Sequence, residues 1–119
     1  MGVDTYVSRT PDLFLTSEDL AAFRDLELPL SEWVANEESV SFRGERYAFV
    51  CMEVTDRTLT YAWLPAADVR EMAAAFLACD PEDVAGRQLG GRNVTAREVY
   101  ALRTVLSVCA ERGLGLLGL

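Results

Sequence analysis

The segment TAREVYALRTVLSVCAERGLGLLGL, residues 95–119, decides the fold because it contains a helix start, a helix end and a final apolar strand. Thr95 and Glu98 have the spacing of a capping box, in which two side chains satisfy the first backbone N–H groups of a helix. Apolar residues recur at helical spacing as far as Arg112, and Gly113 stands where a left-handed residue ends many helices. The segment therefore predicts a helix over residues 96–112, followed by a short buried strand.

The same tail spells G-x-G-x-x-G at Gly113, Gly115 and Gly118, the letters of the dinucleotide-binding fingerprint. In a dinucleotide-binding fold that fingerprint follows a strand and opens a helix, so that the phosphates meet the helix N-terminus. Here the glycines follow a helix, and the order argues against a cofactor site. We expect Gly115 and Gly118 to allow a neighbouring backbone or helix to approach closely.

Two more helices and one more strand carry local signals. Residues 3–8 alternate between apolar and polar side chains, which predicts a strand. Thr16, followed by Asp19 three positions later, predicts a helix start. Pro65 suits the first turn of a helix, and the apolar residues from Val69 onwards follow helical spacing.

The pattern in the middle of the chain predicts strands. From Ser39 the apolar residues alternate, and residues 46–54 form a run that is apolar at both odd and even positions. Residues 58–64 alternate again. We therefore predict a three-stranded antiparallel meander over residues 39–64, with residues 46–54 as its central strand.

These elements together predict one α+β domain over residues 1–119. It should have an antiparallel sheet of four to five strands and about three helices, beginning near Thr16, Pro65 and Thr95 and packed mainly on one face. Residues 87–93, which include two adjacent glycines, form the most flexible internal stretch by composition.

Composition excludes several chemistries. The chain has 11 basic residues against 19 acids and a formal charge of -8 at pH 7; all the basic residues are arginine, and histidine is absent. Without histidine there is no imidazole base and no histidine-bound metal, and without lysine there is no Schiff base. The negative charge argues against nucleic acid as a partner, because duplex binding needs a basic face.

Three cysteines, Cys51, Cys79 and Cys109, lie far apart and have neither the number nor the spacing of a disulfide framework or a metal site. We expect them to be free, buried thiols in a reducing compartment. The first residues lack the pattern of a secretory signal, and no apolar run reaches the length of a membrane span. The sequence therefore predicts a soluble, cytoplasmic protein with no membrane partner.

Acidic residues are the remaining candidates for a site. They gather in two loops and at one predicted helix start, where a carboxylate also complements the helix dipole. Paired carboxylates can hold a metal or transfer protons, but these contexts favour capping and solvated surface, so we assign no catalytic, metal or cofactor residue. As residues that bind a partner we name Glu37, Glu38, Asp56, Asp80, Glu82 and Asp83.

The C-terminal half resembles a family of uncharacterised bacterial proteins. The stretch DVREMAAAFLACDPEDV, a glycine-containing break and then VYALRTVLSVCAERGLGLLGL are similar to the ending of YfbM-like proteins. The likeness covers roughly the last 55 residues and rests on apolar patterns. It implies α+β architecture and a bacterial, intracellular origin, and it implies no catalytic residue.

Two classes of function stay open. The first is a small acidic protein that acts by binding another protein, as an immunity-type or regulatory inhibitor of a basic partner does. The second is a small-ligand-binding or enzymatic domain that uses carboxylate, tyrosine or arginine side chains, and a structural role is a third alternative. The missing residue types favour a protein that is not an enzyme, and the wide apolar surface of the last helix leaves a homodimer open.

Overall fold

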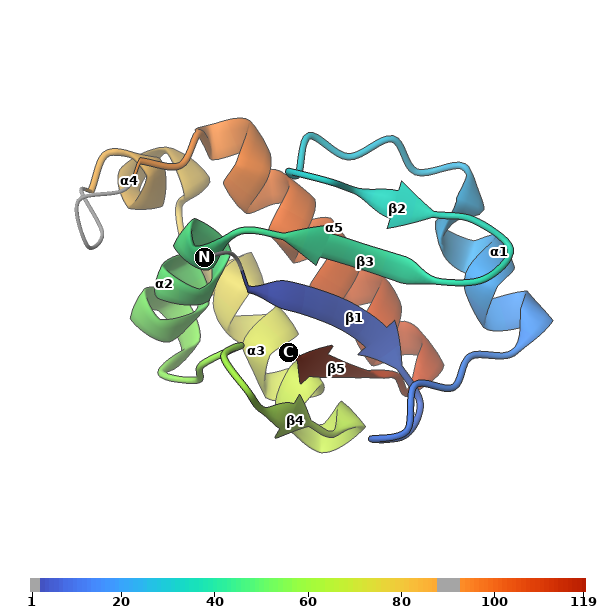
Figure 1. Cartoon of the computed structure of the whole chain (residues 1–119). Helices are drawn as coiled ribbons and strands as arrows, with labels where there is room; N and C mark the ends of the chain where they lie inside the picture. The colour runs from blue at the N-terminus through green and yellow to red at the C-terminus, as the bar shows by residue number, and fades with distance from the viewer. Residues whose placement is uncertain (1–2, 88–92) are drawn as a thin grey trace.

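The computed structural model describes residues 3–87 and 93–119 and shows a five-stranded antiparallel sheet with the long helices α3 and α5 on one face (Figure 1). The predicted α+β fold is confirmed, with five helices among these residues instead of about three. The strands are β1 (Asp4–Ser8), β2 (Val34–Ala35), β3 (Val40–Arg43), β4 (Trp63–Leu64) and β5 (Gly115–Gly118). The helices are α1 (Ser17–Arg24), α2 (Glu45–Thr55), α3 (Ala66–Ala78), α4 (Pro81–Ala85) and α5 (Ala96–Arg112).

The strand order β2-β3-β1-β5-β4 places the first and last strands side by side in the centre of the sheet. Thr5 lies opposite Gly118, and Val7 lies opposite Leu116. Val3, Thr5 and Val7 are buried, as the alternation of residues 3–8 predicts. The chain therefore closes its sheet with the tail that follows α5.

The predicted helix starts and the predicted helix end are confirmed. The Thr16 and Thr95 hydroxyls each accept a hydrogen bond from the backbone N–H three residues later, at 3.1 Å, and both capping boxes are complete. Pro65 is the N-cap of α3, and Gly113 ends α5 with a left-handed φ of 70°. Residues 87–93 are predicted to be flexible, and most of them, 88–92, lie outside the described residues.

The prediction of a central strand over residues 46–54 is wrong, because this run forms α2. Tyr47, Val50 and Cys51 are fully buried at helical spacing, and Met52 and Glu53 are exposed on the opposite side of the helix. A short apolar run is compatible with a strand and with a buried helix, and here tertiary packing stabilises the helix. Gly44, the N-cap, donates its backbone N–H to the carbonyl of Val3, which turns the chain from β3 into α2.

The meander over residues 39–64 is consequently also wrong. β3 pairs with β1 and β2, and of the predicted strand over residues 58–64 only Trp63 and Leu64 pair, with β5. The loop before them has two non-glycine residues with positive φ, Asp56 (58°) and Tyr61 (48°). The loop therefore runs from the end of α2 to the edge of the sheet without forming the expected hairpin.

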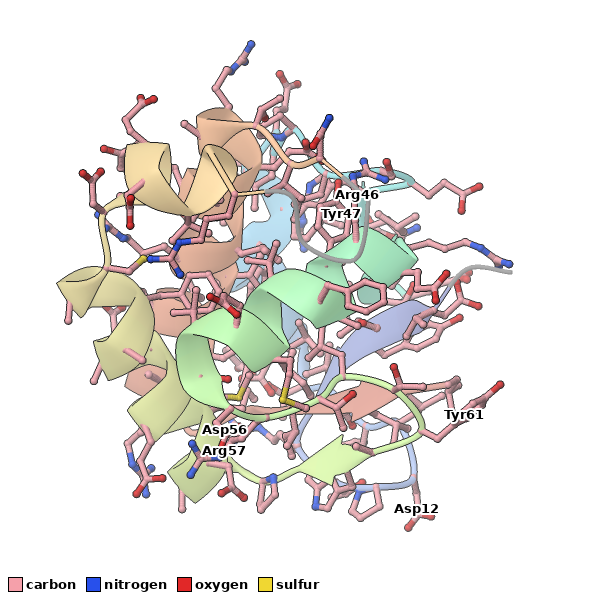
Figure 2. The ribbon with its side chains drawn as sticks, turned by 90° about the vertical axis from the view of Figure 1, so that its left-hand side faces the viewer. Asp12, Arg46, Tyr47, Asp56, Arg57 and Tyr61 are labelled. Atoms are coloured by element: carbon pink, nitrogen blue, oxygen red, sulfur yellow. The ribbon has the colours of Figure 1, made fainter. Side chains whose placement is uncertain are left out.

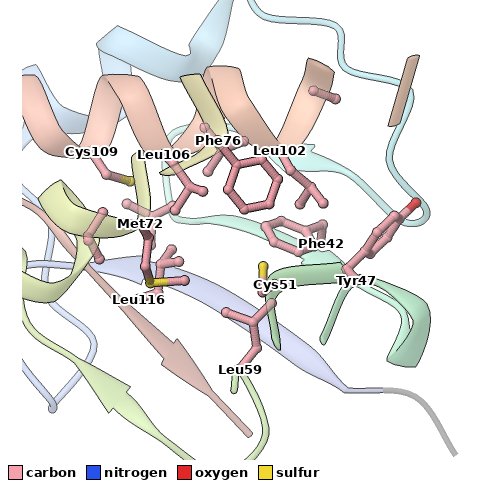
Figure 3. Close-up of a cluster of buried hydrophobic side chains, with 14 of the residues drawn as sticks. Phe42, Tyr47, Cys51, Leu59, Met72, Phe76, Leu102, Leu106, Cys109 and Leu116 are labelled. Atoms are coloured by element: carbon pink, nitrogen blue, oxygen red, sulfur yellow. The ribbon is translucent and has the colours of Figure 1, made fainter. Parts of the chain in front are cut away.

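The core lies between the sheet and helices α3 and α5 (Figure 3). Met72 and Phe76 of α3 meet Leu102 and Leu106 of α5, and all four side chains are buried. α5 also contacts α1 and α4. Its wide apolar surface is thus covered within the chain and gives no separate argument for a homodimer.

Both glycines of β5 lie against another backbone, as expected. A Cβ added to Gly115 would lie 2.4 Å from the carbonyl oxygen of Leu64, and one added to Gly118 would lie 1.4 Å from that of Leu59. Heavy atoms that are not bonded cannot approach so closely. The glycine pattern in the tail therefore serves close packing.

Candidate functional site

The acids named from the sequence lie at separate places in the fold. In Figure 1, α4 and α1 lie at opposite ends of the molecule. The six residues are placed as follows: Glu37 and Glu38 in the turn between β2 and β3, Asp80, Glu82 and Asp83 at the start of α4, and Asp56 at the end of α2.

An open groove of about 510 Å³ lies where α2, α3 and α4 meet, and it brings together Asp80 and Asp83 with a third acid, Glu53. Its apolar lining comes from α2, α3 and α4, and its carboxylates come from α2 and the start of α4. We call it the α2–α4 groove. Its lining residues other than the three acids are Val54, Ala75, Ala78, Cys79, Val84 and Arg87.

Arg87 joins two of the groove's acids. One guanidinium nitrogen donates to the Glu53 carboxylate and another to the Asp83 carboxylate, each at 2.7 Å. The arginine side chain is 44% exposed, and those of Glu53 and Asp83 are 42% and 63% exposed. Ion pairs with such exposure contribute little to stability, so other charges can replace them at low cost.

The start of α4 fixes the positions of the groove's acids. The Asp80 carboxylate accepts a hydrogen bond from the backbone N–H of Glu82 at 3.0 Å, as an N-cap does, and Pro81 occupies the first turn. Glu82 and Asp83 follow in the first turn, where negative charge is favourable. Capping therefore explains why acids gather here, and the groove adds an apolar surface beside them.

Another side of α2 borders a separate hollow, which is lined by Glu45, Ala48, Phe49, Met52, Thr58 and Thr60. Met52 is 43% exposed, and Asp56 follows at the end of the helix. Tyr61, on the loop that follows, is 79% exposed. Figure 2 shows this side of the molecule, with α2 across the middle and α3 and α4 beside it. Exposed aromatic and methionine side chains are common in protein interfaces.

Glu37 and Glu38 border a different hollow. Arg24, Ala35 and Asn36 line it with them, and a smaller hollow beside α1 shares Arg24 and Glu37. The Asn36 side chain accepts hydrogen bonds from the backbone N–H groups of Glu38 and Ser39, which fixes the turn. The two glutamates are exposed and take part in no ion pair among the described residues.

A buried polar network is the strongest candidate for catalysis. The Tyr47 hydroxyl donates to the Glu98 carboxylate at 2.5 Å and accepts from the backbone N–H of Ser31 at 2.8 Å. Arg46 donates to the same Glu98 oxygen at 2.8 Å and stacks on the Tyr47 ring. The network connects the starts of α2 and α5 with the loop before β2.

The protonation states in this network are unsuited to proton transfer. Burial, and then the hydrogen bond to Glu98, raise the pKa of Tyr47. Burial alone would raise the pKa of Glu98, but hydrogen bonds from Tyr47, Thr95 and Arg46 outweigh it, and this pKa is lowered. A general acid or base works best with a pKa near the operating pH, so the network stabilises the fold instead.

A second buried carboxylate also has a structural role. Asp19 is fully buried and accepts hydrogen bonds from Arg9 at 2.5 and 2.7 Å and from Arg112 at 3.1 Å. Burial opposes its charge, but the hydrogen bonds from Arg9, Thr16 and Arg112 hold its pKa well below the usual range. Asp19 therefore ties β1, α1 and α5 together.

Burial makes two of the three cysteines poor nucleophiles. Cys51 and Cys109 are buried, and burial raises the pKa of Cys51 to about 12 and that of Cys109 still further. Cys79 is partly buried at the edge of the groove, and its thiol donates to the carbonyl of Phe76. All three are free thiols.

The described ranges, 3–87 and 93–119, contain neither a metal-binding cluster nor a membrane-spanning helix. No cluster of three or more cysteine or acidic residues there is placed to hold a metal ion. Over the same ranges, every helix is too short or too polar to cross a bilayer.

Glu53 and Arg87 complete the groove, and the sequence analysis did not name them. A signal for Glu53 was present. In a strand over residues 46–54 it would share a buried face with Tyr47 and Cys51, where an unpaired charge is unfavourable. In a helix it faces outward.

Comparison with known proteins adds no assignment to this geometry: no family model, curated protein or solved structure matches the chain.

Proposed function

We propose that this chain acts by binding a basic protein partner, in the manner of an immunity-type or regulatory inhibitor. The observation that carries the proposal is the way charge is distributed. Most of the described arginines are held in ion pairs with acids of the same chain, so the unpaired surface charge is mainly negative. The arginines in such pairs are Arg9, Arg43, Arg46, Arg57, Arg87 and Arg112.

Many exposed acids keep an uncompensated charge. A surface of one sign attracts an oppositely charged partner and raises its association rate. Among the described residues, the exposed acids that form no ion pair are Asp12, Glu18, Asp25, Glu27, Glu37, Glu38, Asp56, Asp80, Glu82 and Glu111.

The α2–α4 groove is the part of this surface best suited to binding. Charge alone steers a partner, whereas affinity needs apolar contact at the centre of the interface. The groove offers Val54, Ala75 and Val84 beside its carboxylates. The hollow that Glu37 and Glu38 share has only Ala35 as an apolar lining residue. Glu38 also borders a smaller hollow of about 150 Å³, which has apolar lining but no second acid: Tyr6, Val7, Leu13, Leu15 and Ser39 line it with Glu38.

The test is salt-dependent capture of proteins from the native lysate by the immobilised chain, with two matched variants. Asp80→Asn/Asp83→Asn and Glu37→Gln/Glu38→Gln remove equal charge from the two ends of the molecule, and asparagine preserves the cap of α4. We expect a basic protein to be captured at low salt, released at high salt, and lost only with Asp80→Asn/Asp83→Asn. Capture that does not respond to salt would contradict the proposal, and so would equal loss with both variants.

The similarity to YfbM-like proteins and a cytoplasmic, bacterial setting remain part of the proposal. An inhibitor of a basic partner has to meet that partner in the same compartment. Fractionation of the native cell, followed by detection of the chain, checks the location.

A further inference from the structure

We propose that the α2–α4 groove binds an arginine side chain of the partner, and that Arg87 occupies this position when the partner is absent. The inference rests on the proposed function and names the chemistry of its partner. Arg87, two residues after the end of α4, donates to Glu53 of α2 and to Asp83 of α4 at 2.7 Å each. These two carboxylates are therefore spaced to share one guanidinium.

The ion pairs of Arg87 are easily exchanged. All three side chains are more than two-fifths exposed, and solvent screens such pairs. An incoming arginine would form the same two hydrogen bonds with the same carboxylates. The exchange therefore preserves the paired charge, and displaced Arg87 is solvated.

The groove also has lining residues besides the two carboxylates that Arg87 binds. An open volume of about 510 Å³ is much larger than one side chain, and Val54, Ala75, Ala78 and Val84 line it. Apolar residues beside the partner's arginine can bury surface there. Asp80, which forms no ion pair among the described residues, offers a further carboxylate for a second basic residue. The carboxylates and the apolar lining together favour a partner segment that carries both arginine and apolar side chains.

The test measures binding of a fluorescein-labelled peptide in which arginine alternates with leucine, by fluorescence anisotropy at low salt. A peptide with glutamate in place of arginine is the control ligand. Arg87→Met keeps an apolar stem and removes the charge. Arg24→Met removes one charge from the opposite end and is the matched control variant.

We expect Arg87→Met to bind the arginine peptide about two- to fivefold more tightly than the wild type, as the loss of one exposed competing pair implies. Arg24→Met should leave the affinity unchanged. Glu53→Gln/Asp83→Asn should weaken binding, and Glu37→Gln/Glu38→Gln should not. The glutamate peptide should not bind.

Each contrary result has a distinct meaning. If Arg87→Met binds as tightly as the wild type, or more weakly, Arg87 does not occupy a partner's position and the inference fails. If Arg24→Met tightens binding by the same factor, the effect comes from net charge alone, and the inference also fails. If no variant binds the peptide, the groove does not take arginine. In each case, lysate capture that is lost with Asp80→Asn/Asp83→Asn would still support the proposed function.

Discussion

The carbonyl oxygen of Leu59 occupies the space that a side chain on Gly118 would need. A Cβ added to this glycine would lie 1.4 Å from that oxygen. Leu59 is buried and belongs to the loop between α2 and β4, while Gly118 lies in the central strand β5. The contact attaches the loop after α2 to the centre of the sheet.

Gly118→Ala should therefore destabilise the protein strongly. Either the loop or β5 has to move, because the clash is with backbone, and we expect a loss of about 3 kcal/mol in the free energy of unfolding. Gly86→Ala is the control, since a Cβ there would meet its nearest atom at 3.4 Å and the φ of -72° suits any residue. The measurement is the midpoint of urea unfolding for both variants. Equal midpoints would show that the packing around Gly118 is looser than described.

Asp19→Asn should lower stability at neutral pH by about 3 kcal/mol, because it breaks a buried ion pair and leaves Arg9 and Arg112 without a counter-charge. Asp25→Asn, at an exposed position that ends the same helix, should change stability by less than about 0.5 kcal/mol.

The effect of Asp19→Asn should depend on pH. The pKa of Asp19 is lower in the folded protein than in the unfolded chain, so its stabilisation is complete above the unfolded value of about 4 and is lost as pH falls through the folded value. Thermal unfolding from pH 7 downwards should show a constant difference between wild type and variant to about pH 5, then a shrinking one. A difference that grows in acid would contradict this assignment.

Tyr47→Phe should cost about 1–3 kcal/mol in the free energy of unfolding, because the partly buried backbone N–H of Ser31 loses its acceptor and Glu98 loses a donor. Tyr100→Phe is the matched control, since Tyr100 is 48% exposed. Binding of the arginine peptide should be unchanged in both folded variants. A Tyr47→Phe protein of normal stability that no longer binds would indicate a functional role for the network.

Local signals account for what the sequence predicted correctly. The two capping boxes, Pro65 and Gly113 each act within a few residues, and they placed α1, α3, α5 and β5. The identity of α2 depends on packing: Tyr47 and Cys51 are buried only because the core lies on that side of the run.

The same dependence explains what was missed in the site. Asp80 and Asp83 could be named because acids at a helix start are visible in the sequence. Glu53 lies beside them only because residues 45–55 form a helix. The groove could not be predicted from a model in which residues 46–54 form a strand. The buried ion pairs could not be predicted from the sequence either, because Asp19 and Arg112 are 93 positions apart and no local pattern relates them.

The most direct test of the central claim is a titration of the chain with the arginine–leucine peptide, followed by amide chemical shifts. The account predicts that the largest shift changes occur around the α2–α4 groove, at Glu53, Ala78 and Asp83, and that these changes vanish in Glu53→Gln/Asp83→Asn. Largest changes at Glu37 and Glu38, or changes of equal size at both acidic ends, would contradict a specific basic-partner site in this groove.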